Sequence, residues 1–167
     1  MNNNSKTSAI VFSVYIVISF YVFGGGIVNS LVSYPTWREV GADEFPKFHR
    51  VDSALIIPLF VVFFFLSFIP QILLFWFRPP VISKQLVVLA LLLNAIVLVS
   101  TIVIQIPIQK QLDLAFSSPL IEQLIHTDFL YRKIPMFLLA ATNFVMLYKV
   151  VRHPNAITAQ SDPIAKY

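Results

Sequence analysis

The sequence predicts an all-α integral membrane protein, folded as an antiparallel four-helix bundle. The chain of 167 residues contains four runs of apolar residues, at about 8–31, 54–77, 85–108 and 134–151. Each run is close to the ~20 residues that a helix needs to cross a hydrocarbon core of ~30 Å. No acidic or basic side chain lies in these runs away from their ends. Charged residues form only 12% of the chain, against about 25% in soluble proteins, which argues against a soluble fold.

The four runs use most of the chain, so we expect one transmembrane domain over 1–167, with 152–167 as a flexible tail. A cleaved signal peptide is the other interpretation of the first run. The run continues through Gly24, Gly25 and Gly26 to Leu31 without a small-residue cleavage site, which favours a retained span. Within a span, these glycines are expected to permit a kink or the close approach of another helix.

The connections between the runs predict how the spans are joined. Pro46 suits the first turn of a helix that leads into the second span, and Pro58 and Pro70 predict kinks within it. The connection Arg78–Ser83 is so short that the second and third spans must be antiparallel neighbours.

The connection 109–133 is expected to contain a short interfacial helix between spans three and four. Ser118-Pro119 is a typical helix start. Apolar residues then recur at helical spacing, at Leu120, Ile121, Leu124, Ile125 and Phe129. An amphipathic helix of this kind is expected to lie at the membrane surface.

Lys and Arg are equally numerous on the two sides of the predicted membrane, so the positive-inside rule does not decide the orientation. The tight basic loop with Arg78 and Lys84 favours cytoplasmic termini. We expect the protein in the bacterial inner (cell) membrane.

Composition excludes several functional classes. The chain has no cysteine, which excludes disulfides, thiolate metal sites and a cysteine nucleophile. The net charge is +4, but basic residues such as Lys84 and Lys149 flank the spans, where lipid headgroups attract them. We therefore expect the lipid bilayer as a partner, with no nucleic acid. An apolar small molecule and a homo-oligomer are further expected partners, and no cofactor motif is present.

Polar residues on the third span, Asn94, Thr101, Gln105 and Gln109, fall on one helical face. Asn94 and Asn143 both lie near mid-membrane, so we expect them to hydrogen-bond to each other and hold their helices together.

Other polar residues gather on the side that carries both long connections and predict a cleft there. The candidate catalytic residues are His49, Asp52, Gln105 and Arg132, and the candidate substrate-binding residues are Asn29, Trp37, Gln109 and His126. His49 would act as a base oriented by Asp52, and Gln105 and Arg132 as oxyanion donors. The competing interpretation is ordinary interfacial charge, with Tyr34, Trp37 and Tyr131 in an aromatic belt. A metal site at His49 and His126 is disfavoured, because no ligand spacing is met.

The order of several short motifs resembles a bacterial family of small four-span membrane proteins with no established activity. The motifs are Tyr34-Pro35-x-Trp37, Phe45-x-x-Phe48-His49, Pro58, Thr101…Gln105-x-Pro107 and Leu124-Ile125-x-Thr127-Asp128-Phe129-x-x-Arg132. The chain is also distantly similar, in size and span layout, to the anthrone-oxygenase-like family, whose fungal members oxidise polycyclic substrates without a cofactor. The resemblance covers roughly 22–147 and carries over best to Trp37, His49, Gln105 and Arg132. Relatives tend to have His in place of Gln109 and Asn-Trp in place of Asp128-Phe129. The resemblance therefore implies that an activity of the family is altered or lost in this chain.

Three functions follow as hypotheses. The chain is a small membrane enzyme, oxygenase-like or isomerase-like, that acts on an apolar substrate at the polar cleft. Alternatively, it is a non-catalytic lipid or quinone binder, or an accessory subunit of a membrane complex. Ion transport is disfavoured unless the protein is oligomeric, because no charged side chain lies in the predicted spans away from their ends.

Overall fold

The structure, a computed structural model, describes residues 3–153, and in this range it is entirely helical. It has 4 helices that are long and apolar enough to cross a membrane: Ser5–Glu39, Phe45–Phe77, Lys84–Leu112 and Ser118–Arg152. We call them the first to fourth long helices. Residues 154–167, which form most of the predicted tail, lie outside the described residues.

Each long helix changes from α-helical to π-helical geometry for one turn. The first consists of α1 (Asn3–Val28), the π turn η1 (Asn29–Ser33), α2 (Tyr34–Thr36) and the 3₁₀ turn η2 (Trp37–Glu39). The second consists of α3 (Phe45–Ile56), η3 (Ile57–Val61) and α4 (Val62–Phe77). The third consists of α5 (Lys84–Ser100), η4 (Thr101–Gln105) and α6 (Ile106–Leu112). The fourth consists of α7 (Ser118–Asp128), η5 (Phe129–Lys133) and α8 (Ile134–Arg152).

Prolines account for these π turns. Pro35, Pro107 and Pro135 each stand second in the α-helical segment that follows a π turn, and Pro58 lies inside η3. A proline lacks the backbone N–H, and its ring collides with the carbonyl four residues earlier. The wider π turn accommodates both effects without ending the helix. The prediction from Pro58 therefore located a real irregularity, whereas α4 continues through Pro70.

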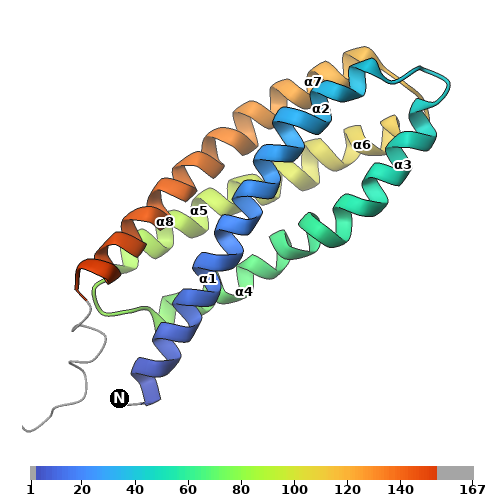
Figure 1. Cartoon of the computed structure of the whole chain (residues 1–167). Helices are drawn as coiled ribbons and strands as arrows, with labels where there is room; N and C mark the ends of the chain where they lie inside the picture. The colour runs from blue at the N-terminus through green and yellow to red at the C-terminus, as the bar shows by residue number, and fades with distance from the viewer. Residues whose placement is uncertain (1–2, 154–167) are drawn as a thin grey trace, which may run out of the picture.

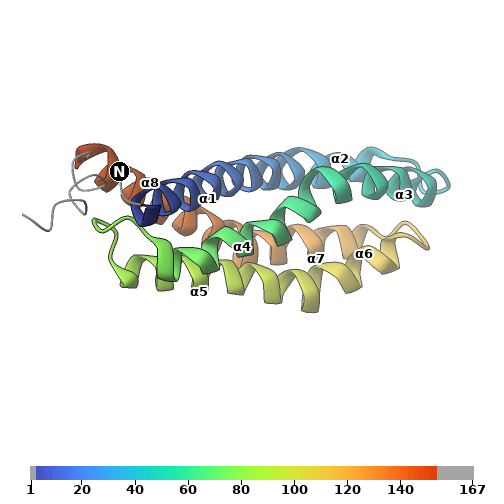
Figure 2. The same ribbon diagram turned by 90° about the horizontal axis from the view of Figure 1, so that it is seen from below.

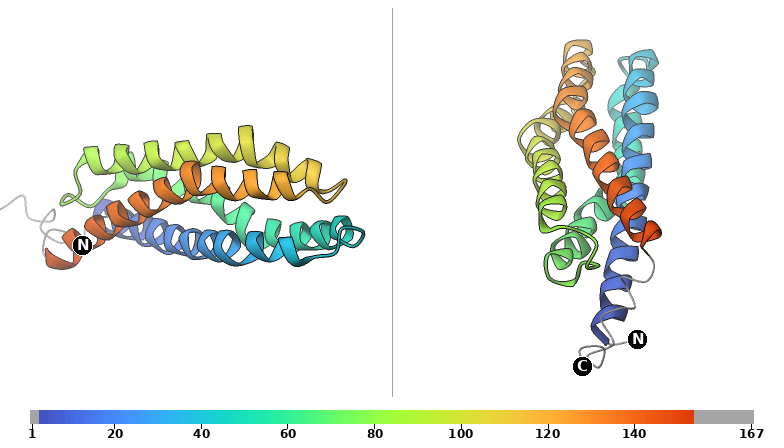
Figure 3. Two further views of the ribbon diagram at one scale, coloured as in Figure 1. Left: turned by 90° about the horizontal axis from the view of Figure 1, so that it is seen from above. Right: turned by 90° about the vertical axis from the view of Figure 1, so that its left-hand side faces the viewer.

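The long helices associate as two pairs. The first and second pack together along α1 and α4, and the third and fourth along α5 and α8. The N-terminus and the end of α8 lie at one end of the molecule (Figures 1 and 3). The loops 40–44 and 113–117 lie at the other, which we call the two-loop end. The second long helix lies against α5 at its α4 end and diverges from α6 along α3 (Figure 2).

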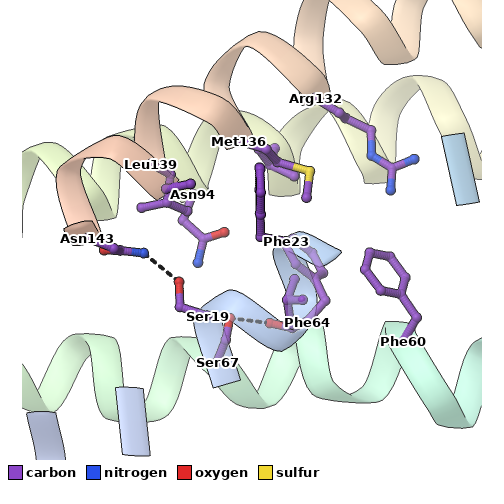
Figure 4. A pocket seen from close by; sticks show the side chains of 13 residues that line it. Ser19, Phe23, Phe60, Phe64, Ser67, Asn94, Arg132, Met136, Leu139 and Asn143 are labelled. Carbon is purple, nitrogen blue, oxygen red and sulfur yellow. Dashed lines mark hydrogen bonds between the residues drawn. The ribbon is translucent and has the colours of Figure 1, made fainter. Parts of the chain in front are cut away.

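A hydrogen-bonded chain of uncharged side chains joins all four long helices, and we call it the neutral chain. Asn94 Nδ2 donates to Gln71 Oε1 (2.7 Å), and Gln71 Nε2 donates to Tyr15 Oη (3.4 Å). Tyr15 Oη donates to Asn143 Oδ1 (2.6 Å), whose Nδ2 donates to Ser19 Oγ (2.6 Å; Figure 4). Asn94 and Asn143 thus act between helices as expected, but they are joined through Gln71 and Tyr15 rather than directly.

The prediction of a separate interfacial helix was wrong. A helix does begin at Ser118, but it continues through η5 into α8 as one long helix. Ile121 and Leu124 are fully buried in a cluster with Trp37 and Phe45. The apolar stripe of this segment therefore faces the other helices rather than a membrane surface. The amphipathic pattern belongs to the part of the fourth long helix that precedes the apolar run.

The glycines of the first long helix permit close packing. A Cβ added at Gly25 would lie 2.9 Å from Phe60 Cδ2, and one at Gly26 would lie 2.5 Å from Met136 Cε. Nothing lies within 4 Å of such an atom at Gly24. The expected close approach is confirmed, at Gly25 and Gly26.

These neighbours predict opposite effects for two adjacent substitutions. Gly25→Ala should lower the free energy of unfolding by about 1–3 kcal/mol, because the added Cβ would displace the Phe60 ring from its contact with the first long helix. Gly24→Ala should leave it unchanged or raise it by up to about 1 kcal/mol, because alanine favours the helix. Denaturant unfolding of both variants in one detergent measures the difference. Equal stabilities would contradict the packing at Gly25.

Candidate functional site

A cavity of about 360 Å³ lies among the long helices toward the two-loop end. Each of the π turns contributes to its wall, through Asn29 of η1, Ile57, Phe60 and Val61 of η3, Thr101 and Gln105 of η4, and Arg132 of η5. π turns are frequent at functional sites in helical proteins. The proline-linked irregularities of separate helices therefore converge on one space.

The cavity is amphipathic. The second long helix supplies an apolar wall, from Ile56 to Phe64. Asp52, Gln109, Lys110 and Asp113 line the mouth toward the two-loop end. Asp52 and Phe64 lie about 18 Å apart along their helix, at a rise of ~1.5 Å per residue. The cavity is therefore elongated, with a charged mouth and an apolar inner part.

His49 stands behind the wall of this cavity and is fully buried, at 0% exposure. Its Nδ1 lies 2.7 Å from Asp113 Oδ1, and its Nε2 lies 2.6 Å from Gln109 Oε1. Both ring nitrogens are thus occupied by neighbouring side chains. The expected partner of His49 was Asp52, but the structure gives it Asp113. Asp52 lines the cavity itself.

Hydrogen bonds continue from Gln109 to Arg132, and ion pairs continue from Arg132 to Asp128 and Lys133. Gln109 Nε2 and Arg132 Nη1 both donate to Tyr34 Oη, at 3.4 and 3.3 Å. Arg132 Nη1 lies 3.0 Å from Asp128 Oδ1, and Lys133 Nζ lies 3.0 Å from Asp128 Oδ2. We call the whole series the charged chain, and it connects Asp113, His49, Gln109, Tyr34, Arg132, Asp128 and Lys133. Like the neutral chain, it joins all four long helices.

The inner end of the charged chain is buried. Asp128, Arg132 and Lys133 are exposed by only 2%, 5% and 2%. They lie about 15–22 Å from the start of the fourth long helix at Ser118. The apolar run 134–151 is therefore only part of that helix. The absence of charge, on which the sequence argument against transport rested, does not hold for the whole helix.

Three buried polar atoms on cavity-lining residues have no hydrogen-bond partner within the described part of the chain: Trp37 Nε1, Gln105 Oε1 and Arg132 Nε. Buried polar atoms are normally paired. The guanidinium of Arg132 extends from its helix toward the side of Phe60 (Figure 4). No protein group in the described part of the chain therefore satisfies these atoms.

A second, smaller space adjoins the cavity and shares Phe60, Phe64 and Arg132 with it. Its volume is about 20 Å³, which is room for about one water molecule. Ser19 and Asn143 of the neutral chain lie on its wall (Figure 4). The two hydrogen-bonded chains are thus separated by little more than this space.

The structure brings together most of the candidate residues. Asn29, Trp37, Asp52, Gln105, Gln109 and Arg132 line the cavity. His49 reaches it through Gln109 and Asp113. His126 is exposed on α7 and does not line it.

Sequence reasoning missed three residues that the structure places in the charged chain. Tyr34 was assigned to an aromatic belt, but it is buried and accepts two hydrogen bonds. Asp113 and Lys133 lie in segments read as a connection, where nothing in the sequence reveals their partners. Within residues 3–153, no group of three His, Asp or Glu side chains is placed to hold a metal ion.

Comparison of the chain with protein-family models, with curated proteins and with solved structures gave no match. The geometry of the cavity is therefore the basis for a functional conclusion.

Because Arg132 and Lys133 share the Asp128 carboxylate, we expect the stability of the fold to depend strongly on Asp128. Asp128→Asn should lower the free energy of unfolding by about 3–5 kcal/mol, because two basic groups then stay buried without a counter-charge. Lys133→Met should be neutral or stabilising, because Arg132 and Asp128 then pair one to one. Unfolding in detergent measures both variants.

Glu122→Gln is the matched control. Glu122 is an exposed acid on the same helix, 2.6 Å from Arg38, and its loss should change stability by less than about 1 kcal/mol. An Asp128→Asn protein as stable as the Glu122→Gln protein would contradict the buried charge cluster.

Proposed function

We propose that the chain is an integral membrane protein whose cavity binds an apolar small molecule with a polar head group. In this proposal the long helices form an antiparallel bundle in the bacterial inner membrane, with cytoplasmic termini. Large apolar side chains on the outer surface support membrane insertion; Trp76, Phe144 and Val103 are exposed by 65%, 62% and 65%. A surface of this kind also suits a homo-oligomer or a place in a larger membrane complex.

The observation that carries the proposal is the cavity wall. One side is apolar, along the second long helix, and the other carries the unpartnered atoms of Trp37, Gln105 and Arg132. Its volume of about 360 Å³ falls in the range of about 300–1,000 Å³ for small-molecule pockets. Apolar walls with a few convergent polar groups are typical of such pockets.

The cavity also has an entrance suited to a molecule dissolved in lipid. Ile57 and Ile106, from the second and third long helices, line it and are themselves 50% and 38% exposed. We place the entrance between these two helices, because lining residues of both also reach the outer surface there. In a bilayer, an apolar molecule would enter there from the side.

Catalysis on the bound molecule is a second candidate, favoured by the position of Gln109. In the bacterial and anthrone-oxygenase-like families that this chain resembles, relatives tend to have His at this place. Gln109 lines the cavity and contacts His49. A histidine there would stand at the cavity wall with His49 behind it. The structure supports this candidate less than binding, because both nitrogens of His49 are occupied.

Filling the cavity should abolish binding. Trp37 lines the cavity and Trp76 is exposed, so in a Trp76→Phe protein the fluorescence of Trp37 reports on the cavity. Bromododecanol, a chain-brominated neutral amphiphile, should quench it saturably. Val61→Phe should weaken this quenching at least about ten-fold, because the larger side chain occupies ligand space.

Val62→Phe is the control, since Val62 is the adjacent residue, is 44% exposed and does not line the cavity. It should bind bromododecanol like the parent. Quenching that rises without saturation, or that is equal in the two variants, would show partition into detergent rather than binding in the cavity.

The catalytic candidate has its own test. With anthrone as the probe, oxygen uptake by the Gln109→His protein should exceed that of the wild type, because a histidine at the cavity wall can take up the substrate proton. Gln111→His, on the exposed side of the same helix, should behave like the wild type. Absence of uptake above background in all three proteins would remove the catalytic candidate and leave the binding function in place.

A further inference from the structure

We propose that the head group of the bound molecule is anionic, a carboxylate or another acidic oxygen group, and that Arg132 binds it. This inference rests on the proposed binding function and specifies its ligand class. It is carried by the charge balance around the cavity and by the unpartnered atoms on its wall.

The mouth of the cavity carries more acids than lysine or arginine side chains. Asp52 and Asp113 are the acids there, and Lys110 is a base that also lines the cavity. His49 Nδ1 lies 2.7 Å from Asp113 Oδ1, so this acid already has a partner. The mouth therefore does not favour an anionic ligand.

The inner part of the cavity is different, because two basic side chains share one acid. Arg132 and Lys133 both contact Asp128, and all three are buried. Two basic groups thus share one carboxylate in an apolar environment, where an unpaired charge is strongly unfavourable. Of the two basic residues, Arg132 lines the cavity. An anion in the cavity would give Arg132 an acidic partner of its own.

The geometry of Arg132 leaves room for such an anion. Its Nη1 is engaged by Asp128 and Tyr34, but its Nε has no partner. Tyr34 Oη receives two hydrogen bonds, which hold the guanidinium in place. Trp37 also lines the cavity, and its Nε1 is a second donor without a partner. Donors that are fixed in position bind an acidic oxygen group well, since charge-assisted hydrogen bonds are the stronger kind.

The apolar tail then has a defined direction. Phe60 and Phe64 line the cavity on the side away from the mouth, and both are buried. A head at Arg132 and a tail along these rings would match the polarity of one bilayer leaflet, with the head toward the two-loop end. The ligand class is thus a single-chain acidic amphiphile, such as a fatty acid.

The test compares three probes with one chain and different heads. Quenching of Trp37 is measured in the Trp76→Phe protein with bromododecanoate, bromododecanol and bromododecyl-trimethylammonium at a pH where the acid is ionised. The carboxylate should bind at least about ten-fold more tightly than the alcohol, because a hydrogen bond to a charged group is worth more than a neutral one. The cationic probe should bind more weakly than the alcohol.

Variants then assign the preference to Arg132. Arg132→Gln should make the carboxylate and the alcohol bind equally, and Arg132→Lys should keep part of the preference. Arg152→Gln, which removes an exposed arginine of the same helix, should leave the preference unchanged. If Arg132→Gln does not fold, the binding of the three probes is compared between the parent and Arg132→Lys. A smaller preference for the carboxylate in Arg132→Lys then assigns the preference to Arg132.

The possible results separate the two proposals. Equal binding of carboxylate and alcohol to the parent, or a preference that survives Arg132→Gln, would overturn the anionic head while the cavity still binds. Absence of saturable quenching by all three probes would overturn the binding function, and the inference with it.

Discussion

Prolines within long helices are the constraint on which the rest of this structure depends. A helix in apolar surroundings must satisfy its own backbone hydrogen bonds, because no water is there to do so. Pro35, Pro58, Pro107 and Pro135 interrupt that pattern, and each lies in or directly after a π turn. All the π turns lie on the two-loop side of the long helices and line one cavity. The residues that disturb the helices are thus the residues that make space between them.

The two hydrogen-bonded chains show what this arrangement holds together. In the neutral chain, Tyr15, Gln71, Asn94 and Asn143 satisfy one another, which is the usual role of amides between helices. The charged chain is built around Tyr34 in a similar way, but it leaves Arg132 Nε unpaired and contains more basic than acidic groups at its inner end. The neutral chain, whose members satisfy one another, is explained by a structural role alone. An unbalanced chain beside a cavity is better explained by something that binds there.

Hydropathy and motif spacing predicted part of this structure. The apolar runs located the four long helices, because hydropathy responds directly to the apolar surface. They did not locate the helix ends, since a helix continues past its apolar part; the fourth begins at Ser118 rather than near Ile134. The glycines correctly indicated close packing, and Pro58 correctly indicated an irregular turn.

The candidate site was less accessible from sequence. Six of the candidate residues, among them Asn29, Gln105 and Arg132, could be placed near one another because polar residues of spans tend to face inward, and they do line one cavity. The pairing of His49 with Asp113 depends on how the second and third long helices meet, which local patterns do not contain. The same holds for the sharing of Asp128 between two basic groups.

The most direct test of a ligand-binding cavity is native mass spectrometry of the full chain, extracted from its membrane in a mild detergent. The account predicts one small amphiphile retained per chain, at a mass that fragmentation identifies as an acidic lipid or a similar molecule. A protein that is bare, or that carries only a variable number of bulk phospholipids, would contradict it.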